Sequence, residues 1–173
     1  GNRLRRLVNT ARTPGVHVLA VYRFGRWSRG QRLVWRVFLE PDYYLFNFLV
    51  QVVWGVELPR EAKIGPGLRI GHFGGITVSP HAVIGRNCGI SQNVTIGAGG
   101  QGEKAGAPVI GDDVYIGPGA RVFGKIRVGN NAKIGANAVV YRDVPDDAVV
   151  VLDPGFRILS FNGNHRSPLR QVA

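Results

Sequence analysis

Cysteine, methionine and acidic residues are scarce in this chain, and each shortage narrows what it can be. The 173 residues contain one Cys and no Met. A single Cys excludes a disulfide-stabilised scaffold and a Cys-rich zinc module. Because even an initiator Met is lacking, we expect Gly1 to be a trimmed end. The 45% hydrophobic and 19% charged residues are typical of a globular domain, not of a disordered chain.

Acidic residues are missing altogether from residues 1–36, which hold nine Arg. This segment carries +9 of the formal net charge of +11, and the remaining 137 residues carry only +2. A basic chain can bind nucleic acid, but the sequence has no recognisable nucleic-acid-binding module. We therefore expect no nucleic-acid partner, and we treat the charge as a property of the N-terminal segment.

The N-terminal segment, residues 1–57, has the apolar spacing of helices. In residues 16–28 and 31–54 apolar side chains recur at steps of three and four, which favours amphipathic helix. Pro41 is expected to break the second stretch, with a further helix from about Asp42. Gly55 is a suitable stop for that helix.

Residues 43–54 are strongly apolar but too few to cross a membrane, which needs about 20 residues. One interpretation is a helix that is buried or faces another subunit. The other is a helix that rests on an anionic membrane surface, with the arginines as its polar flank. No secretory signal is recognisable, so we expect a cytoplasmic protein, at most peripheral at the inner face of the membrane.

The glycine-rich second half carries an internal repeat of six residues. Aliphatic residues, mostly followed by Gly, recur at positions 64, 70, 84, 90, 96, 110, 116, 122, 128, 134 and 140, and a small or apolar residue follows most of them four positions later. This period matches neither helix nor simple strand alternation. It predicts a hexapeptide β-helix, mainly β in class, with the aliphatic residues inside and the glycines easing the corners. Cys88 falls on an inward position and is expected to be a buried small side chain.

The repeat is interrupted twice, and a solenoid accommodates insertions only as protruding loops. Two extra residues lie around His72, and about eight lie within residues 97–108. We expect a β-helix domain over residues 58–152 with a protruding loop at 97–108, followed by a C-terminal tail at 153–173. Functional residues are expected on the two loops.

Three segments carry a family resemblance: AKIGPGLRIGH at 62–72, QNVTIGAGG at 92–100 and AKIGANAVVYRDVP at 132–145. They resemble the hexapeptide-repeat acyltransferases, most closely the serine acetyltransferase branch, over residues 57–157. The resemblance implies a left-handed parallel β-helix, a homotrimer with active sites between neighbouring subunits, and acetyl-CoA as acyl donor, without a metal.

Two segments differ from that branch. Gly71-His72 stands where serine acetyltransferases typically have Asp-His, and Gly106-Ala107-Pro108 stands where they have Arg-His-Pro. In this the chain is more similar to the colanic acid acetyltransferases of polysaccharide biosynthesis. The expected function is therefore an acetyl-CoA-dependent O-acetyltransferase acting on a sugar hydroxyl of a surface polysaccharide. Serine O-acetylation in cysteine biosynthesis is the alternative.

His72 is the candidate general base, because it lies on an inserted loop and matches the position of the family base. A His with a pKa near neutrality suits proton removal from an attacking hydroxyl. The resemblance places Glu57 as the carboxylate that orients this base, whereas a plain surface Glu at a helix end is the alternative. Backbone N–H groups of the glycine-rich loops are the expected oxyanion donors.

The CoA thioester is expected to run along backbone that lacks bulky side chains. The candidate residues are Gly97, Ala98 and Gly99 beside the long loop and, by resemblance, Gly117, Pro118, Gly135 and Ala136 on successive coils. Arg157 could meet the CoA phosphates, with Lys104 as a second option.

Three other functions are alternatives to transferase activity. A non-catalytic trimeric scaffold would bind acetyl-CoA without turnover. A metal enzyme of the γ-carbonic anhydrase type needs three His at a subunit junction, and the repeat contains only His72 and His81. A nucleic-acid-binding protein would use the N-terminal arginines, which the helical segment explains better.

Overall fold

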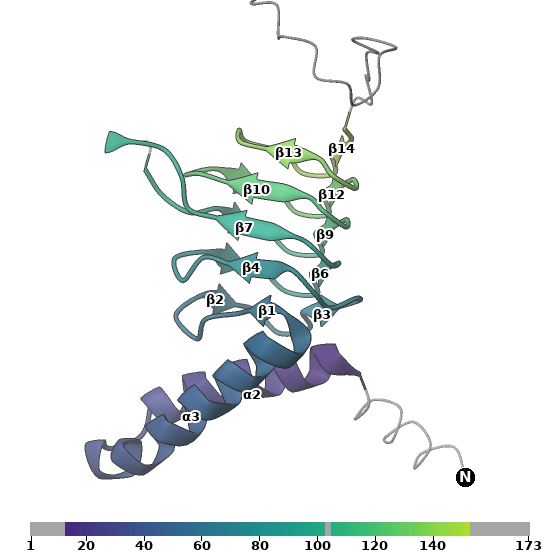
Figure 1. Ribbon diagram of the computed structural model, residues 1–173. Helices are drawn as coiled ribbons and strands as arrows, with labels where there is room; N and C mark the ends of the chain where they lie inside the picture. The colour runs from purple at the N-terminus through teal and green to yellow at the C-terminus, as the bar shows by residue number, and fades with distance from the viewer. Residues whose placement is uncertain (1–12, 103–104, 153–173) are drawn as a thin grey trace, which may run out of the picture.

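Two helices and fourteen short strands make up the described part of the chain, which is residues 13–102 and 105–152 of the computed structural model. Helix α2 (Pro14–Arg29) and helix α3 (Leu33–Trp54) come first and lie side by side beneath the strands (Figure 1). The strands are β1 (Val56–Glu57), β2 (Lys63–Ile64), β3 (Arg69–Ile70), β4 (Ile76–Val78), β5 (Val83–Ile84), β6 (Gly89–Ile90), β7 (Thr95–Gly97), β8 (Val109–Ile110), β9 (Tyr115–Ile116), β10 (Arg121–Phe123), β11 (Arg127–Val128), β12 (Lys133–Ile134), β13 (Val139–Val140) and β14 (Val149–Val150).

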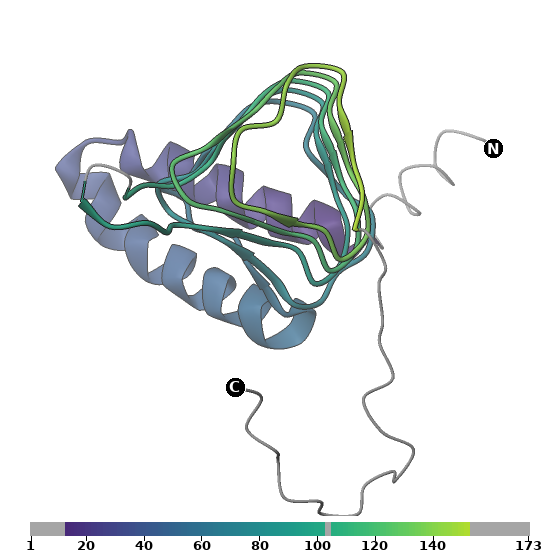
Figure 2. The ribbon, with the colours of Figure 1, turned by 90° about the horizontal axis from the view of Figure 1, so that it is seen from above.

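The strands form three parallel sheets, which are the three sides of a triangular coil (Figure 2). Sheet A has the order β1-β4-β7-β10-β13, sheet B has β11-β8-β5-β2, and sheet C has β14-β12-β9-β6-β3. The chain thus passes from A to B to C and back to A in each turn. The hexapeptide β-helix expected from the repeat is confirmed. Its first strand begins at Val56, two residues before the expected start, because β1 pairs with β4.

The interior is a stack of the aliphatic residues that the repeat singled out. Ile96, for example, lies between Val78 and Val122 in the ladder of sheet A, and all three are fully buried. Cys88 is buried with them, and its Sγ lies 3.2 Å from the carbonyl oxygen of Gly111. Burial raises the pKa of this thiol, which agrees with the expected inert core residue.

The glycines that follow the aliphatic residues serve a purpose different from the one expected. They do not have positive φ angles; instead, a Cβ on Gly65 would lie 2.7 Å from the carbonyl oxygen of Gly85, and one on Gly117 would lie 2.9 Å from the amide nitrogen of Ala136. Close approach of successive coils therefore requires them. The left-handed corner conformation falls elsewhere, on Asn and Asp residues and a few other glycines, such as Asn87 with φ 56° and Asn131 with φ 53°.

Helix α2 caps the open lower edge of the β-helix. Strand β2 ends sheet B, so its backbone groups have a neighbouring strand on one side only. The Tyr22 hydroxyl donates to the Ala62 carbonyl (2.7 Å) and accepts from the Ile64 amide (3.1 Å). The Arg23 guanidinium donates to the carbonyls of Ile64 (3.0 Å) and Gly65 (2.6 Å). The cap thus supplies the partners that a further coil would otherwise provide.

Helix α3 runs without interruption through Pro41, so the expected break there is wrong. Proline in a helix leaves the carbonyl four residues earlier, here that of Val37, without its amide partner. Pro41 and Val37 both lie on exposed positions, where water can satisfy that carbonyl. Gly55 ends the helix in the left-handed conformation, with φ 61° and ψ 37°, and confirms the expected stop.

A buried arginine ties helix α3 to the first coil. Arg60 donates from Nη2 to Oε2 of Glu40 (2.6 Å), and its guanidinium lies 4.2 Å from the centre of the Tyr43 ring. The Arg60 side chain is only 4% exposed. The hydrogen bond from Arg60 holds the pKa of Glu40 below its ordinary value. Gly25 of α2 leaves room for this contact, because a Cβ there would overlap Tyr43.

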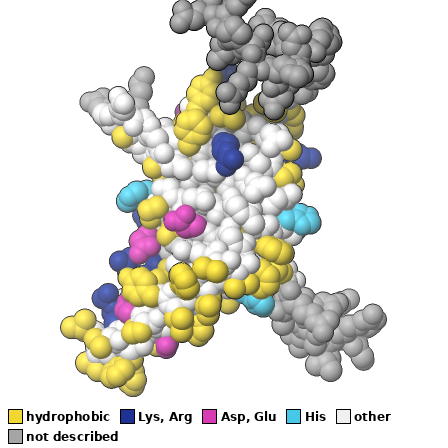
Figure 3. All heavy atoms as spheres, in the orientation of Figure 1, with side chains coloured by type: hydrophobic (Ala, Val, Ile, Leu, Met, Phe, Trp, Pro, Cys, Tyr) yellow, Lys and Arg dark blue, Asp and Glu magenta, His cyan; other side chains and the backbone are white. Residues whose placement is uncertain are grey.

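The outer face of helix α3 is apolar and exposed, so a helix buried within this chain is the wrong interpretation. Of its 22 residues only Tyr43 and Val50 are buried. Figure 3 shows hydrophobic side chains gathered over the helices. Within the described residues, helices long and apolar enough to cross a membrane are absent.

Two arginines of helix α2 bind the first coil of the β-helix. Arg26 donates to the carbonyl of Ala62, and Arg29 pairs with Glu61 at 2.9 Å.

Candidate functional site

The candidate base lies on one vertical corner of the coil, which we call the C/A corner because the chain there leaves sheet C for sheet A. Gly71-His72 follows β3, Gly117-Pro118 follows β9 and Gly135-Ala136 follows β12. Backbone hydrogen bonds run up this corner, from Gly71 N to the Ile90 carbonyl (3.0 Å) and from Gly117 N to the Ile134 carbonyl (2.8 Å). The fold thus aligns three sequence-predicted segments on one edge.

His72 lies on the short loop between β3 and β4, and its side chain is exposed. The loop packs on the end of helix α3, because the Phe73 ring meets the Trp54 ring edge-on with centroids 5.1 Å apart. Gly55 makes this packing possible, since a Cβ there would lie 3.3–3.4 Å from Gly75 N and Gly74 Cα. The candidate base is therefore exposed to solvent on a loop that the helix supports.

Glu57 lies nearby in the topology, on the first strand of sheet A, where it pairs in register with Thr77. Its side chain is exposed, as is that of His72. Both residues are in the described part of the chain, and no hydrogen bond or ion pair joins them there. Glu57 is placed where a carboxylate could approach the base, but it does not orient His72 in this conformation.

The other group of predicted residues lies on the A/B corner, where the chain leaves sheet A for sheet B. Gly97, Ala98 and Gly99 end strand β7 and begin the long loop, which protrudes from the coil at the left of Figure 1. Gly99 and Gly106 face each other across the neck of this loop and exchange two backbone hydrogen bonds of 2.9 Å. The neck is therefore a short antiparallel ribbon that leads away from the body of the chain.

Within one chain, the full width of sheet A separates the two corners. His72 precedes the strands of this sheet and Gly97 ends one of them, so the predicted base and the predicted long-loop segment do not meet. Arg157 and Lys104 lie outside the described residues.

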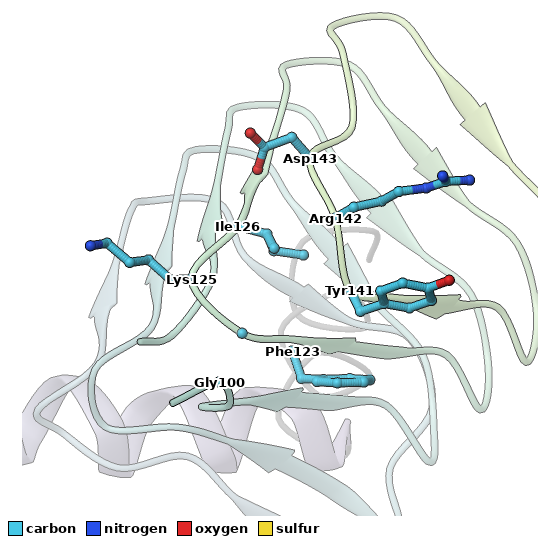
Figure 4. A pocket seen from close by; sticks show the side chains of 8 residues that line it. Gly100, Phe123, Lys125, Ile126, Tyr141, Arg142 and Asp143 are labelled. Atoms are coloured by element: carbon cyan, nitrogen blue, oxygen red, sulfur yellow. The ribbon is translucent and has the colours of Figure 1, made fainter. Parts of the chain in front are cut away.

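A hollow of about 520 Å³ lies on the A/B corner beside the long loop, and sequence reasoning missed it. It is lined by Gly100, Phe123, Gly124, Lys125, Ile126, Tyr141, Arg142 and Asp143 (Figure 4). The only signal in the sequence is that Phe123 and Tyr141 each directly follow an inward Val of the repeat and lie 18 residues, or three repeats, apart.

A smaller hollow of about 270 Å³ lies on sheet C beside the C/A corner. Arg69, Gly71 and Tyr115 are among its lining residues, and the Tyr115 hydroxyl is 3.2 Å from the Ser91 Oγ. In residues 13–102 and 105–152 we find no cluster of three His, Cys, Asp or Glu side chains that could hold a metal ion.

Comparison with known proteins gives the family. The family model "Bacterial transferase hexapeptide (six repeats)" matches residues 107–142. The serine acetyltransferase of Helicobacter pylori is 36% identical over 141 residues, which are 80% of this chain and 77% of that protein. The chain belongs to the serine acetyltransferase family. The serine acetyltransferase of Synechococcus elongatus is 36% identical over 156 residues, which are 90% of this chain and 61% of that protein.

Solved structures of family members share the fold. Serine acetyltransferase isoform 3 of Entamoeba histolytica, in complex with cysteine, superimposes with a TM-score of 0.70 at 30% identity, over 86% of this chain and 51% of that one. The Brucella abortus enzyme in complex with coenzyme A gives 0.69 at 28% identity, over 82% and 54%. The expected left-handed β-helix is confirmed. Against several of these relatives the chain spans only about half of their length.

The sequence-based expectation of a polysaccharide O-acetyltransferase is wrong, because the similar proteins found are serine acetyltransferases. That expectation relied on Gly71 and on Gly106-Ala107, a few positions on two loops. Side chains elsewhere around a site can bind the same acceptor, so the lack of charged side chains at those positions does not show that the acceptor is a different molecule. The match along most of the chain carries more weight.

Proposed function

We propose that this chain is a serine O-acetyltransferase, which moves the acetyl group of acetyl-CoA to the hydroxyl of serine. Its membership in the family supports the reaction class, and the relative solved with coenzyme A supports the donor. The exposed His72, aligned on one corner with Gly117 and Gly135, is the structural observation that carries the proposal. A base held on a supported loop can take the proton of an attacking hydroxyl, while the glycine backbone beside it leaves room for the long CoA thioester.

In the proposed mechanism His72 takes the proton of the serine hydroxyl as its oxygen attacks the thioester carbonyl. The tetrahedral intermediate carries one negative charge, which backbone N–H groups of the glycine-rich loops beside the site stabilise, since the amides of Gly71, Gly117 and Gly135 already donate within the coil. When the intermediate collapses, the C–S bond breaks, and the CoA thiolate takes the proton from the imidazolium. O-acetylserine and CoA leave, and His72 returns to its neutral form. Glu57 is a positioning residue that approaches the ring when substrate is bound.

Arg69 is the proposed partner of the serine carboxylate. Its side chain is exposed and lines the same hollow as Gly71, directly beside His72 in the sequence. A guanidinium can hold a carboxylate through two parallel hydrogen bonds. This gives the site an anchor for an amino acid although Gly71 and Gly106-Ala107 supply no charged side chain. Arg69→Gln should raise the KM for serine more than it lowers kcat.

The proposed assembly is a homotrimer with sites between chains. Its support is the separation of the two predicted halves: His72 lies on the C/A corner, while Gly97–Gly99 and the long loop lie on the A/B corner. A protruding loop can reach the other corner only in a neighbouring copy. A cyclic arrangement then makes one complete site per interface. Association of the helical segment with a membrane surface stays a prediction.

The test is release of CoA from acetyl-CoA by the purified chain, with and without L-serine, and mass-spectrometric detection of O-acetylserine. His72→Ala should lower turnover by about 10²- to 10⁴-fold, the usual contribution of a general base. His17→Asn is the matched control, because His17 is also exposed but lies on helix α2 and on neither corner. Absence of serine-dependent CoA release would overturn the proposal, and full activity of His72→Ala would overturn the assignment of the base.

A further inference from the structure

Two aromatic side chains give the hollow on the A/B corner an unusual character. Phe123 ends strand β10, and Tyr141 directly follows strand β13 on the next coil. Their side chains are 38% and 64% exposed. Figure 4 shows both rings extending in the same direction from the coil, with Tyr141 above Phe123. We call this feature the aromatic hollow, with Phe123, Tyr141 and Arg142 as its defining residues. Its volume of about 520 Å³ is in the range of small-molecule sites.

The two rings are close enough together for one planar heteroaromatic ligand to contact both of them. Their centroids are 6.4 Å apart and their planes differ by 32°. A planar ring inserted between them would need about 3.5 Å on each side, the usual contact distance between carbon atoms. Since the centroids are 6.4 Å apart and the planes are tilted, the two rings have to rotate toward parallel and move apart to hold a flat heteroaromatic base on both faces. Exposed side chains on the outside of a coil can make such an adjustment.

The charge beside the rings is positive. Arg142 extends along the same side as the two rings, whereas Lys125 points to the opposite side of the hollow (Figure 4). The carboxylate of Asp143 points away from the rings, and its Oδ1 accepts a hydrogen bond of 2.7 Å from the backbone N–H of Arg127. A guanidinium next to a stacking site is suited to a base that carries phosphate groups.

The aromatic hollow lies directly against the backbone proposed to face CoA. Phe123 pairs in register with Gly97, and a Cβ on Gly99 would lie 3.3 Å from the Phe123 ring. Gly100, the next residue of the loop, lines the hollow itself. A ligand that follows Gly97–Gly99 would therefore meet the two rings at the end of its path.

We propose that the aromatic hollow binds the 3′-phospho-ADP end of CoA, with the adenine between Phe123 and Tyr141 and a phosphate paired with Arg142. This rests on the proposed function, because it takes the donor to be a CoA thioester. The thioester end of the same molecule would then reach His72 of the neighbouring chain. The aromatic pair thus determines how firmly the donor is held, and the C/A corner carries out the chemistry.

Isothermal titration with CoA and with 3′,5′-ADP tests the proposal without turnover. Phe123→Leu and Tyr141→Leu should each weaken both ligands by roughly 5- to 100-fold, the range that base stacking on an aromatic side chain supports. Arg142→Gln should weaken them as well, less so at high salt, where the ion pair is screened. Trp27→Leu is the matched control, because it removes from helix α2 an aromatic ring whose exposure (55%) lies between those of Phe123 and Tyr141.

Kinetics separate this inference from the proposed function. Wild type should prefer acetyl-CoA to S-acetylpantetheine in kcat/KM, and the Phe123 and Tyr141 variants should lose that preference. If serine is not acetylated but 3′,5′-ADP binding still depends on the two rings, the hollow is assigned and only the function fails. Unchanged CoA and 3′,5′-ADP affinities in both variants would overturn the inference. The inference would also be overturned if the variants lost affinity because they no longer assembled, as measured by sedimentation. The two rings would then be a contact between subunits.

Discussion

Removing one hydroxyl from the helical cap should destabilise the entire β-helix. Tyr22 is 1% exposed, and its hydroxyl donates to the Ala62 carbonyl and accepts from the Ile64 amide at the lower edge of sheet B. Tyr22→Phe keeps the ring and its packing. It deletes both hydrogen bonds without creating a large cavity, so the change in unfolding free energy reports on the cap alone.

The size of the destabilisation depends on which hydrogen-bond partners the two backbone groups keep in the variant. The Ala62 carbonyl still accepts from Arg26 Nη1 at 3.3 Å, so its loss is partial. The Ile64 amide loses its acceptor in a buried position, which costs about 1–3 kcal/mol. We therefore expect Tyr22→Phe to lower the free energy of unfolding by about 2 kcal/mol. For a urea dependence of about 2 kcal/mol per M, the midpoint falls by roughly 1 M.

The assay is urea denaturation at one fixed protein concentration, because the stability of an oligomer depends on concentration. Tyr44→Phe is the matched control, since Tyr44 is a 60% exposed ring on the neighbouring helix. It should change the free energy of unfolding by less than about 0.5 kcal/mol. If Tyr22→Phe changed stability no more than Tyr44→Phe, the idea that helix α2 satisfies the edge of the first coil would be refuted.

Two further predictions concern the acid dependence and the thiol. The hydrogen bond from Arg60 lowers the pKa of Glu40, so its contribution to stability is complete above the ordinary value of 4.5 and is lost as the pH falls through the lower folded-state pKa. Urea midpoints measured below pH 4.5 should therefore fall more steeply in wild type than in Glu40→Gln, and equal slopes would contradict the ion pair. Burial raises the pKa of Cys88, so a thiol reagent should label it far more slowly in the native protein than in urea, and rapid native labelling would contradict its place in the core.

The repeat predicted the core because a coil repeats the same environment every six residues. Ile64, Ile84 and Ile110 occupy one such column, and the structure stacks them in sheet B. The reason for the glycines was harder to predict. A sequence does not show that a Cβ at Gly65 would strike the coil above, because that distance depends on the stacking of turns far apart in sequence. Pro41 was misjudged for a related reason, since its tolerance depends on which face of the helix is exposed.

The candidate site was predictable in part. The insertion around His72 broke the repeat and therefore indicated a loop, and Gly117 and Gly135 share its corner because the period brings them there. The aromatic hollow was not predicted. Phe123 and Tyr141 read as ordinary strand residues, and only the stacking of their coils brings the rings within 6.4 Å. The acceptor was mispredicted because a few loop positions cannot define an entire pocket.

The most direct test of the account is complementation between two inactive variants. One is His72→Ala, which loses the base on the C/A corner. The other replaces residues 100–105 with Asn-Gly, a two-residue turn that closes the ribbon at Gly99 and Gly106 and removes most of the loop on the A/B corner. Each should form trimers that do not acetylate serine.

In trimers assembled at random from equal amounts of both variants, about a quarter of the interfaces should join an intact His72 corner to an intact loop of the next chain. The account predicts that serine-dependent CoA release returns to about a quarter of the wild-type rate. Mixed trimers, verified by native mass spectrometry, that remained inactive would contradict a site shared between chains.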